Sequence, residues 1–479
     1  MKKQFKLNVT IKANNKLKQI TPLQGYNTKT GLKACAKRVV GQYGKGYAQL
    51  QNNYCSPRWS YLIKESKMPL SFDSYSHCAF NCKYCLAYYQ KALKSCNPLF
   101  PGENTNYRKM KPRSINLASF DRLMHLEKKS QFYDYVKAGL PLQWGGLADP
   151  FCYFEDKYRV GLEILKILDD VKYPTSFSTK GVNFTLDEEY MELFKQNPNW
   201  RMQWSIINLD KARAAEVEQA VPSPTIRLGA MQRFIEYTGR SATLRLRPFI
   251  IGLSDIDDEY LDLIAEAAKI GSKRVSMEFF CLESRMSPGV KKRYDDLSES
   301  VGFDIVDFYR KNSPSMSGYL RLNWKLKARY VEKMLKVCKQ FGMAFYSSDS
   351  MTKDMSRSFG NPSEFQKEFT GNYSQAMLKG MKRENKECYW TDVLPGIKEA
   401  GLHKFNWRHA EGYNTVGNQT RARRWLQTME EFLHECWNAP NDHKSPYHHF
   451  FGVMVPCRVD KDGDVVYKYT PRKGIRYID

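Results

Sequence analysis

Short β-rich runs alternate with helical stretches between about residue 69 and residue 350, and this alternation constrains the fold more than any other feature of the sequence. The runs that we predict as strands are 69–76, 141–146, 174–179, 200–207, 242–250, 273–280 and 343–348. Sequential strands that are joined by helices pair in parallel through right-handed crossovers. We therefore predict an α/β protein with a partial (βα)6-type parallel barrel, whose functional residues lie at the carboxyl ends of the strands.

Two of the helical stretches carry clear start and stop signals. Ser223 can cap a helix that has Pro224 in its first turn, and Gly239 can end this helix. The stretch 257–271 has acidic residues in its first turn and Gly271 at its end. These signals support the assignment of crossover helices between the predicted strands.

The remaining sequence divides the chain into three regions. At roughly 150 residues per domain, 479 residues are enough for two or three domains. We expect a basic N-terminal extension over 1–67, the partial barrel over 68–350 and an appended C-terminal domain over 351–479. In the last region we predict a helix near 420–436 and a terminal hairpin with an Asp-Gly turn.

Positive charge is in excess and unevenly distributed. Lys and Arg number 75 against 51 Asp and Glu, which gives a formal net charge of +24. Residues 1–67 hold 14 Lys and Arg against the single acid Glu65. Aromatic residues alternate with these bases, and such a mixture suits either a grip on phosphates and exposed bases or a solvated arm packed on the protein. A DNA, RNA or other polyanionic partner is a reasonable expectation.

The composition also bears on location and on the use of cysteine. There is no apolar run of about 18 uncharged residues, and the basic first residues are not followed by an apolar core. We therefore expect neither a membrane span nor a secretory signal, and a cytoplasmic protein. Twelve cysteines are too sparse for a disulfide scaffold and indicate metal ligands, reactive thiols or buried small side chains.

Three cysteines follow the first predicted strand at a spacing of C-x3-C-x2-C. They are Cys78, Cys82 and Cys85. Three thiolates on one tight loop can hold three irons of a [4Fe–4S] cluster and leave the fourth iron open. A zinc ion would instead need a fourth ligand to close its tetrahedron, and the nearby choices are His77 and Cys96.

The cysteine loop, with Tyr84 before its third cysteine, resembles the signature of the radical S-adenosylmethionine superfamily. The sequence from the fourth predicted strand onward resembles the spore photoproduct lyase-like branch of that superfamily. The matching residues are Ser205, Glu218, Pro222, Pro224, Arg227, Leu228, Pro248 and Gly252. The segments with Asp149-Pro150 and Thr179-Lys180 are similar to those after strands two and three of that branch. The resemblance covers about residues 70–255.

This resemblance implies a radical enzyme with two cofactors, a [4Fe–4S] cluster and S-adenosylmethionine. In that family the open iron binds the amino and carboxylate groups of S-adenosylmethionine. One electron from a reduced flavodoxin- or ferredoxin-like donor then gives a 5′-deoxyadenosyl radical. The implied cofactor-binding residues are Tyr84 at the adenine, Gly145 and Gly146 at the amino group, Lys180 at the carboxylate, Ser205 at the ribose, and Arg245 or Arg247 at an anion.

The final hydrogen donor is where the sequence departs from the branch. Photoproduct lyases carry a donor cysteine at the place that corresponds to Gly146, so their repair reaction is not implied. Cys152 and Cys281 are the thiols that can still face the site, although a buried inert cysteine is the commoner case. Glu278 and Tyr346 lie on predicted strands and are further choices as relays.

A second metal site is a further hypothesis for the C-terminal region. Its ligands would come from Cys436, His443, His448, His449 and Cys457. Cysteine and imidazole suit zinc, but the spacing matches no compact zinc motif.

Taken together, the sequence favours a radical S-adenosylmethionine enzyme that repairs or modifies a nucleic acid or nucleotide. Two alternatives stay open. One is the same chemistry on a peptide or small metabolite, and the other is a non-enzymatic zinc or iron–sulfur protein that binds nucleic acid.

Overall fold

The computed structural model describes most of the chain between residues 70 and 474. The described residues are 57–59, 70–87, 112–127, 130, 132–286, 288–314, 319–349, 351–361, 364, 376–377, 380–381, 386–399, 428–442 and 445–474. Most of the basic extension over 1–67 lies outside them, and so do Cys96 and His443. The interpretation of the extension therefore stays a prediction.

One large sheet organises the chain. Its strands, in spatial order, are β1 (Arg58–Trp59), β2 (Leu70–Phe72), β3 (Leu142–Trp144), β4 (Thr175–Thr179), β5 (Trp200–Ser205), β6 (Thr243–Phe249), β7 (Arg274–Phe279), β10 (Ala344–Ser347) and β11 (Arg357–Ser358). The strands from β2 to β10 are parallel, and β1 and β11 add antiparallel edges. Each parallel strand lies within its predicted run. The α/β class and the parallel order are confirmed, and no pairing among the described strands closes the sheet into a full barrel.

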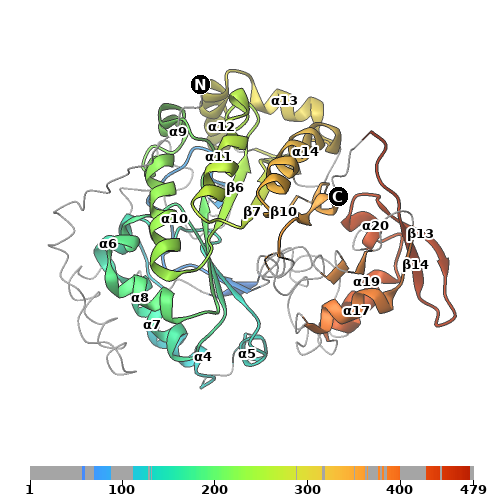
Figure 1. Cartoon of the computed structure of the whole chain (residues 1–479), viewed down its shortest axis with the longest axis horizontal. Helices are drawn as coiled ribbons and strands as arrows, with labels where there is room; N and C mark the ends of the chain where they lie inside the picture. The colour runs from blue at the N-terminus through green and yellow to red at the C-terminus, as the bar shows by residue number, and fades with distance from the viewer. Residues whose placement is uncertain are drawn as a thin grey trace.

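Helices connect the parallel strands and cover one face of the sheet (Figure 1). They are α4 (Leu117–Met124), α5 (Tyr133–Lys137), α6 (Tyr153–Tyr158), α7 (Val160–Asp170), α8 (Glu188–Gln196), α9 (Lys211–Val217), α10 (Pro224–Thr238), α11 (Glu259–Lys269), α12 (Pro288–Val301), α13 (Ile305–Asn312) and α14 (Trp324–Gln340). The signals for α10 act as predicted, with Pro224 in its first turn and Gly239 at φ +66° after its end.

The two faces of the sheet differ in polarity. Alternate residues of a strand point to opposite faces, so each strand contributes to both. On the helix-covered face the side chains are mainly apolar, and the ring centres of Trp204 and of Phe234 on α10 lie 5.4 Å apart. The opposite face, called the polar face below, carries Ser71, Gln143, Ser176, Ser178, Gln203, Ser205, Thr243, Arg245, Arg247, Ser276, Glu278 and Tyr346. Parallel sheets are usually buried by apolar residues on both faces, so this polarity indicates a functional surface.

The C-terminal residues form a smaller unit beside the sheet (Figure 1). Its elements are β12 (Glu387–Cys388), α17 (Trp390–Glu399), α19 (Met429–Trp437), α20 (Pro446–His449), β13 (Met454–Val459) and β14 (Val465–Tyr469). The predicted hairpin is present as β13 and β14, with Gly463 at φ +89° in its turn. The predicted helix is present as α19.

Polar contacts join this unit to the end of the sheet. The side chain of Arg472 pairs with buried Asp354 at 3.1 Å, and Lys353 lies 3.5 Å from the His449 ring. The sheet itself extends past residue 350 through β11, and before residue 68 through β1. The limits of the three predicted regions stay predictions.

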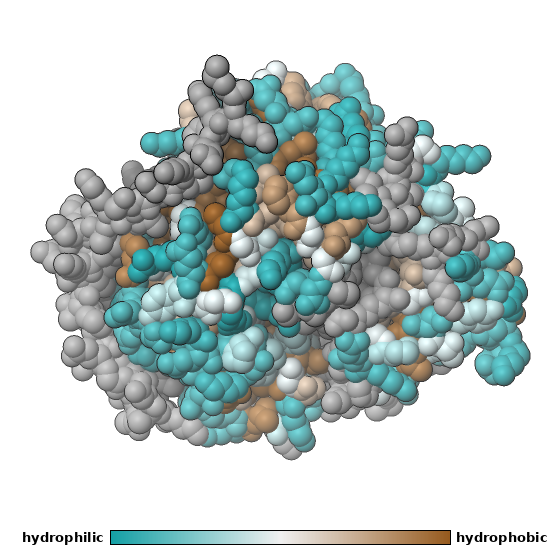
Figure 2. Space-filling view, viewed as in Figure 1, coloured by the Kyte–Doolittle hydropathy of each residue, from teal (hydrophilic) through white to brown (hydrophobic). Residues whose placement is uncertain are grey.

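The described surface in the view of Figure 2 is mainly hydrophilic, with small hydrophobic areas between the charged side chains. Among the helices of the described residues, none has the length and the apolar character needed to cross a membrane.

Candidate active site

The cysteine loop begins directly after β2 and is anchored by its backbone. The Lys83 N–H donates to the Val217 carbonyl at 2.8 Å, and the Arg293 guanidinium donates to the Cys82 carbonyl at 2.7 Å. Asn81 turns the loop with φ 48°, a left-handed conformation that asparagine tolerates better than most residues. These contacts hold the loop at the carboxyl edge of the sheet, as the sequence predicts for a functional loop.

The three cysteine thiols are free; Cys82 is buried, while Cys78 and Cys85 are partly exposed. Burial raises the pKa of Cys78 and of Cys82, while the nearby Lys180 ammonium opposes the rise at Cys82. The Phe80 N–H lies 3.5 Å from the Cys78 sulfur. The pKa values of both cysteines stay raised, so the backbone donor and the cation offset only part of the cost of forming the thiolates that bind iron. What suits a [4Fe–4S] cluster is the C-x3-C-x2-C spacing on a loop at the carboxyl edge of the sheet.

A closed site for a single metal ion has less support. Within the described ranges, no three His, Cys, Asp or Glu side chains converge as the ligands of one ion would. His77, the nearby alternative ligand, bonds through Nδ1 to Ser76 at 3.0 Å and packs 5.0 Å from the Phe154 ring. The described members of the C-terminal Cys/His group do not converge in this way either, so the second metal site gains no support.

Two aspartates, the buried Asp73 and the partly buried Asp149, fix the loops after the first strands. Asp73 accepts hydrogen bonds from the N–H groups of Leu147 and Ala148, each at 3.0 Å. Asp149 accepts the Thr179 hydroxyl at 2.7 Å and the Lys180 N–H at 2.6 Å. The loops after β2, β3 and β4 are thus linked to one another, and Asp149 acts as a positioning residue.

A buried network places Tyr84 and Ser205. The Tyr84 hydroxyl donates to Glu218, which also pairs with Arg227 at 2.5 Å. Arg227 donates in turn to the Ser205 carbonyl at 2.7 Å. Burial and the adjacent Glu218 carboxylate raise the pKa of Tyr84, so that its proton stays on the hydroxyl. The network joins the cysteine loop, the end of α9, α10 and β5 into one rigid constellation.

Lys180 lies at the same place, directly after β4. Its ammonium group is 5.5 Å from the centre of the Tyr84 ring, within cation–π range. Burial lowers the pKa of Lys180, but the neighbouring Cys82 and Glu218 outweigh burial and raise the pKa above its usual value. Lys180 therefore stays charged beside the cysteine loop, as an anion-binding residue must.

The glycine pair follows β3. Gly145 has φ +94°, and a Cβ there would lie 2.5 Å from the Ser178 carbonyl oxygen. At Gly146 a Cβ would lie 2.9 Å from the Arg58 guanidinium. Only glycine suits the first position, and the backbone can be approached closely there.

Some of the other predicted site residues lie near Ser205 and the cysteine loop, and others lie near the end of β7. Arg245 donates to the Ser205 hydroxyl at 3.3 Å and so belongs with the first constellation. Cys152 is fully buried, and its proximity contributes to the raised pKa of Cys78, which puts it beside the cysteine loop. Cys281 instead follows β7, near the charges of Arg321 and Glu278. Tyr346 lies on the polar face on β10, the strand next to β7, in register with Ser276.

Sequence reasoning missed Asn208 and Arg321. Asn208 is fully buried just after β5, and neither polar atom of its amide has a hydrogen-bond partner among the residues that the structure describes. Buried amides are normally satisfied, so this one indicates a ligand or water. Its position three residues after Ser205 was the available signal. Arg321 follows β9 (Tyr319–Leu320), a strand too short to predict.

No protein-family model and no curated protein matches the sequence. Solved structures do show a similar fold at low identity. A mutant of spore photoproduct lyase is 14% identical with a TM-score of 0.45, over 62% of this chain and 80% of that one. Spore photoproduct lyase complexed with dinucleoside spore photoproduct is 13% identical with a TM-score of 0.43, over 69% and 88%.

A radical SAM methyltransferase from Sphaerobacter thermophilus is 13% identical with a TM-score of 0.32, over 61% of this chain and 69% of that one. Likeness of this size carries no argument about reaction or substrate. The solved structures named here, to which this chain is similar, are thus two of spore photoproduct lyase and one of a radical SAM methyltransferase.

Proposed function

We propose that the chain is a radical S-adenosylmethionine enzyme whose cluster is held by Cys78, Cys82 and Cys85. The observation that carries this proposal is the place of the C-x3-C-x2-C loop at the carboxyl edge of a parallel sheet, where Lys180 lies beside Tyr84 and Cys82. When bound, the [4Fe–4S] cluster and S-adenosylmethionine supply a 5′-deoxyadenosyl radical that abstracts hydrogen.

The residues around the loop have separate tasks in this proposal. Lys180 supplies the positive charge for a carboxylate, and Gly145 leaves space for an amino group against the backbone. Ser205 and the unpartnered Asn208 amide offer hydrogen bonds at the end of β5. Tyr84 is held by Glu218 and offers a ring face. These groups are fixed before any ligand arrives, which reduces the cost of binding.

The substrate in this proposal is a nucleic acid or nucleotide that is repaired or modified, and the electron donor is a reduced flavodoxin- or ferredoxin-like protein. The net charge of +24 supports the substrate class, because phosphate contacts by basic residues dominate such binding. The final hydrogen donor would be Cys281, which is at the substrate side of the sheet, or Cys152, which is beside Cys78.

The test is anaerobic reconstitution with iron and sulfide, followed by dithionite and S-adenosylmethionine and an assay for 5′-deoxyadenosine. We expect iron uptake and product in the wild type, and neither in Cys82→Ala, because one of three cluster ligands is gone. Cys338→Ala is the matched control, since Cys338 is a buried cysteine on α14 outside the site. Binding of zinc in place of iron, or full product from Cys82→Ala, would overturn the proposal.

A further inference from the structure

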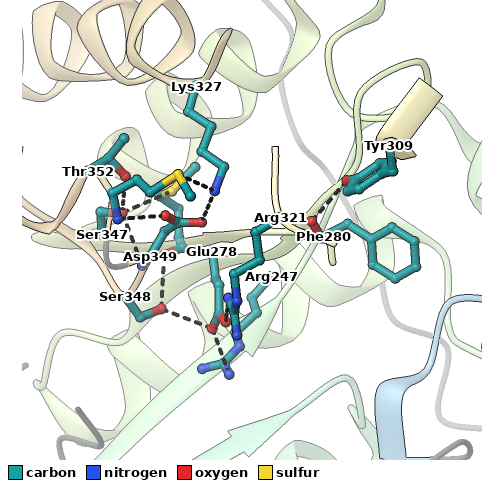
Figure 3. Close-up of polar contacts among 12 residues, drawn as sticks. Arg247, Glu278, Phe280, Tyr309, Arg321, Lys327, Ser347, Ser348, Asp349 and Thr352 are labelled. Carbon is teal, nitrogen blue, oxygen red and sulfur yellow. Dashed lines mark hydrogen bonds and ion pairs between the residues drawn. The ribbon is translucent and has the colours of Figure 1, made fainter. Parts of the chain in front are cut away.

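A second group of charges lies on the polar face, at the carboxyl ends of β6, β7 and β10 (Figure 3). Its centre is Glu278 on β7. The Glu278 carboxylate pairs with Arg247 on β6 at 2.6 Å, accepts the Ser348 hydroxyl at 3.2 Å and lies 4.0 Å from the Arg321 guanidinium. Two arginines around one carboxylate leave the group with net positive charge.

A buried ion pair with no net charge lies next to this group. Lys327 and Asp349 form an ion pair at 2.6 Å, and each side chain is only 1% exposed. Asp349 also accepts the Met351 N–H at 2.9 Å, which fixes the turn after β10 that carries Ser348. In the view of Figure 3 this pair is drawn above Arg247 and Glu278. The buried pair therefore holds the turn in place.

The solvent exposure of the side chains shows which of these residues a ligand can reach. The side chain of Arg247 is 38% exposed, and those of Arg321 and Glu278 are 19% and 16% exposed. A guanidinium has five N–H donors, and the contact of Arg247 with Glu278 runs through Nη2. Arg247 can thus keep Glu278 and still bind an oxyanion, the geometry in which arginine recognises phosphate.

The place of this group relative to the network of Tyr84, Glu218, Arg227 and Ser205 suggests what it could bind. Arg245 contacts Ser205, and Arg247, two residues further along the same strand, contacts Glu278. Because alternate residues share a face, the two arginines lie in succession on the polar face. Cys281 follows β7 beside the same charges. A ligand held at Arg247 would lie across the polar face from the cysteine loop.

We propose that Arg247 and Arg321, oriented by Glu278 and Ser348, bind a phosphodiester of a nucleic-acid substrate. This inference deepens the proposed function and rests on it for the reaction, but the binding itself needs no radical chemistry. Glu278 has a second effect, since its carboxylate competes with the phosphate for both guanidinium groups. The Glu278 carboxylate therefore lowers the affinity of the site for phosphate, and its removal raises that affinity.

The test measures binding of a labelled single-stranded DNA of about 12 nucleotides to the full-length protein, without S-adenosylmethionine, between about 50 and 200 mM salt. We expect Arg247→Gln and Arg321→Gln each to weaken binding about tenfold, and to reduce the slope of log affinity against log salt by about 0.7. Glu278→Gln should tighten binding severalfold. A purely structural role predicts no such opposite change.

Arg458→Gln is the matched control, because Arg458 forms an exposed pair with Glu387 at 2.7 Å on the C-terminal sheet. Thermal unfolding of each variant checks that it is folded. Unchanged binding in folded Arg247→Gln and Arg321→Gln would overturn the proposal. Stronger binding of an acidic peptide than of DNA, lost in the same variants, would also overturn it.

The outcome is separable from that of the proposed function. If 5′-deoxyadenosine forms but DNA binding ignores Arg247, the phosphate site is wrong and the radical chemistry stands. If DNA binding depends on Arg247 but no 5′-deoxyadenosine forms, the phosphate site stands and the proposed function is wrong.

Discussion

Two arginine–glutamate pairs lie near the same edge of the sheet and differ in their exposure to solvent. Arg227 and Glu218 are 2.5 Å apart with side chains 0% and 1% exposed. Arg247 and Glu278 are 2.6 Å apart with side chains 38% and 16% exposed. The contact distances are nearly equal, so the pairs differ in surroundings. The same chemistry therefore serves two purposes.

The buried pair is compensated on both sides. Glu218 also accepts the Tyr84 hydroxyl, and Arg227 also donates to the Ser205 carbonyl. Desolvation of two charges costs several kcal/mol, and such extra hydrogen bonds offset it. The exposed pair has less desolvation to recover and keeps access to solvent. One pair holds the proposed cofactor side rigid, while the other is available to a ligand.

The largest effect should come from breaking the buried pair. Glu218→Gln leaves the Arg227 charge buried without its carboxylate, and we expect a loss of about 3–5 kcal/mol in the free energy of unfolding. Urea denaturation monitored by tryptophan fluorescence measures this loss. Glu278→Gln is the control with the same chemical change at the exposed pair. A loss below about 1 kcal/mol in Glu218→Gln would mean that the buried pair does not hold this part of the fold together.

Glu163 is a buried carboxylate with fewer stabilising partners than Glu218. We expect its replacement to change the free energy of unfolding by less, and to raise it. Burial raises the pKa of Glu163 on α7 to about 7 from an ordinary value of 4.5, although Lys166 at 3.1 Å opposes the rise. Within the described part of the chain, its Oε2 atom has no hydrogen-bond partner. Because the folded state holds this proton more tightly than the unfolded state, the contribution of Glu163 to stability falls as pH rises from about 4.5 to about 7.

We therefore expect Glu163→Gln to stabilise the protein by about 2 kcal/mol at pH 8 relative to the wild type, with little difference near pH 4. Urea denaturation across this pH range measures the difference. The wild type itself contains other titrating groups, so the quantity to compare is the gap between the two curves. A gap that does not change with pH would show that Glu163 is not held protonated.

The sequence predicts the parts of this fold that depend on local pattern. Alternation of apolar runs located every parallel strand, and the turn chemistry of Asp462-Gly463 located the hairpin. The cysteine spacing located the loop, because C-x3-C-x2-C is a local feature. The resemblance then suggested Lys180 and Ser205, which the structure places around Tyr84 or its network.

The remaining features depend on strand register and were beyond local pattern. Alternation placed Arg245 and Arg247 on one face, but only the pairing of β6 with β5 and β7 gives them Ser205 and Glu278 as separate partners. Arg321 reaches Glu278 from a two-residue strand, which leaves no periodic signal. The edge strand β1 is equally short.

The smallest effect on stability should come from breaking the exposed pair, even though the effect on ligand binding there is the largest that we expect. Arg247→Gln should lower the free energy of unfolding by less than about 1 kcal/mol, because exposed ion pairs gain little from their Coulomb energy. Urea denaturation of this variant at about 0.1 M and about 1 M salt measures the loss and its screening. A loss as large as that of Glu218→Gln would mean that Arg247 is a structural residue. Arg247 would then be unable to release donors to a phosphate, and the contrast between the two pairs would disappear.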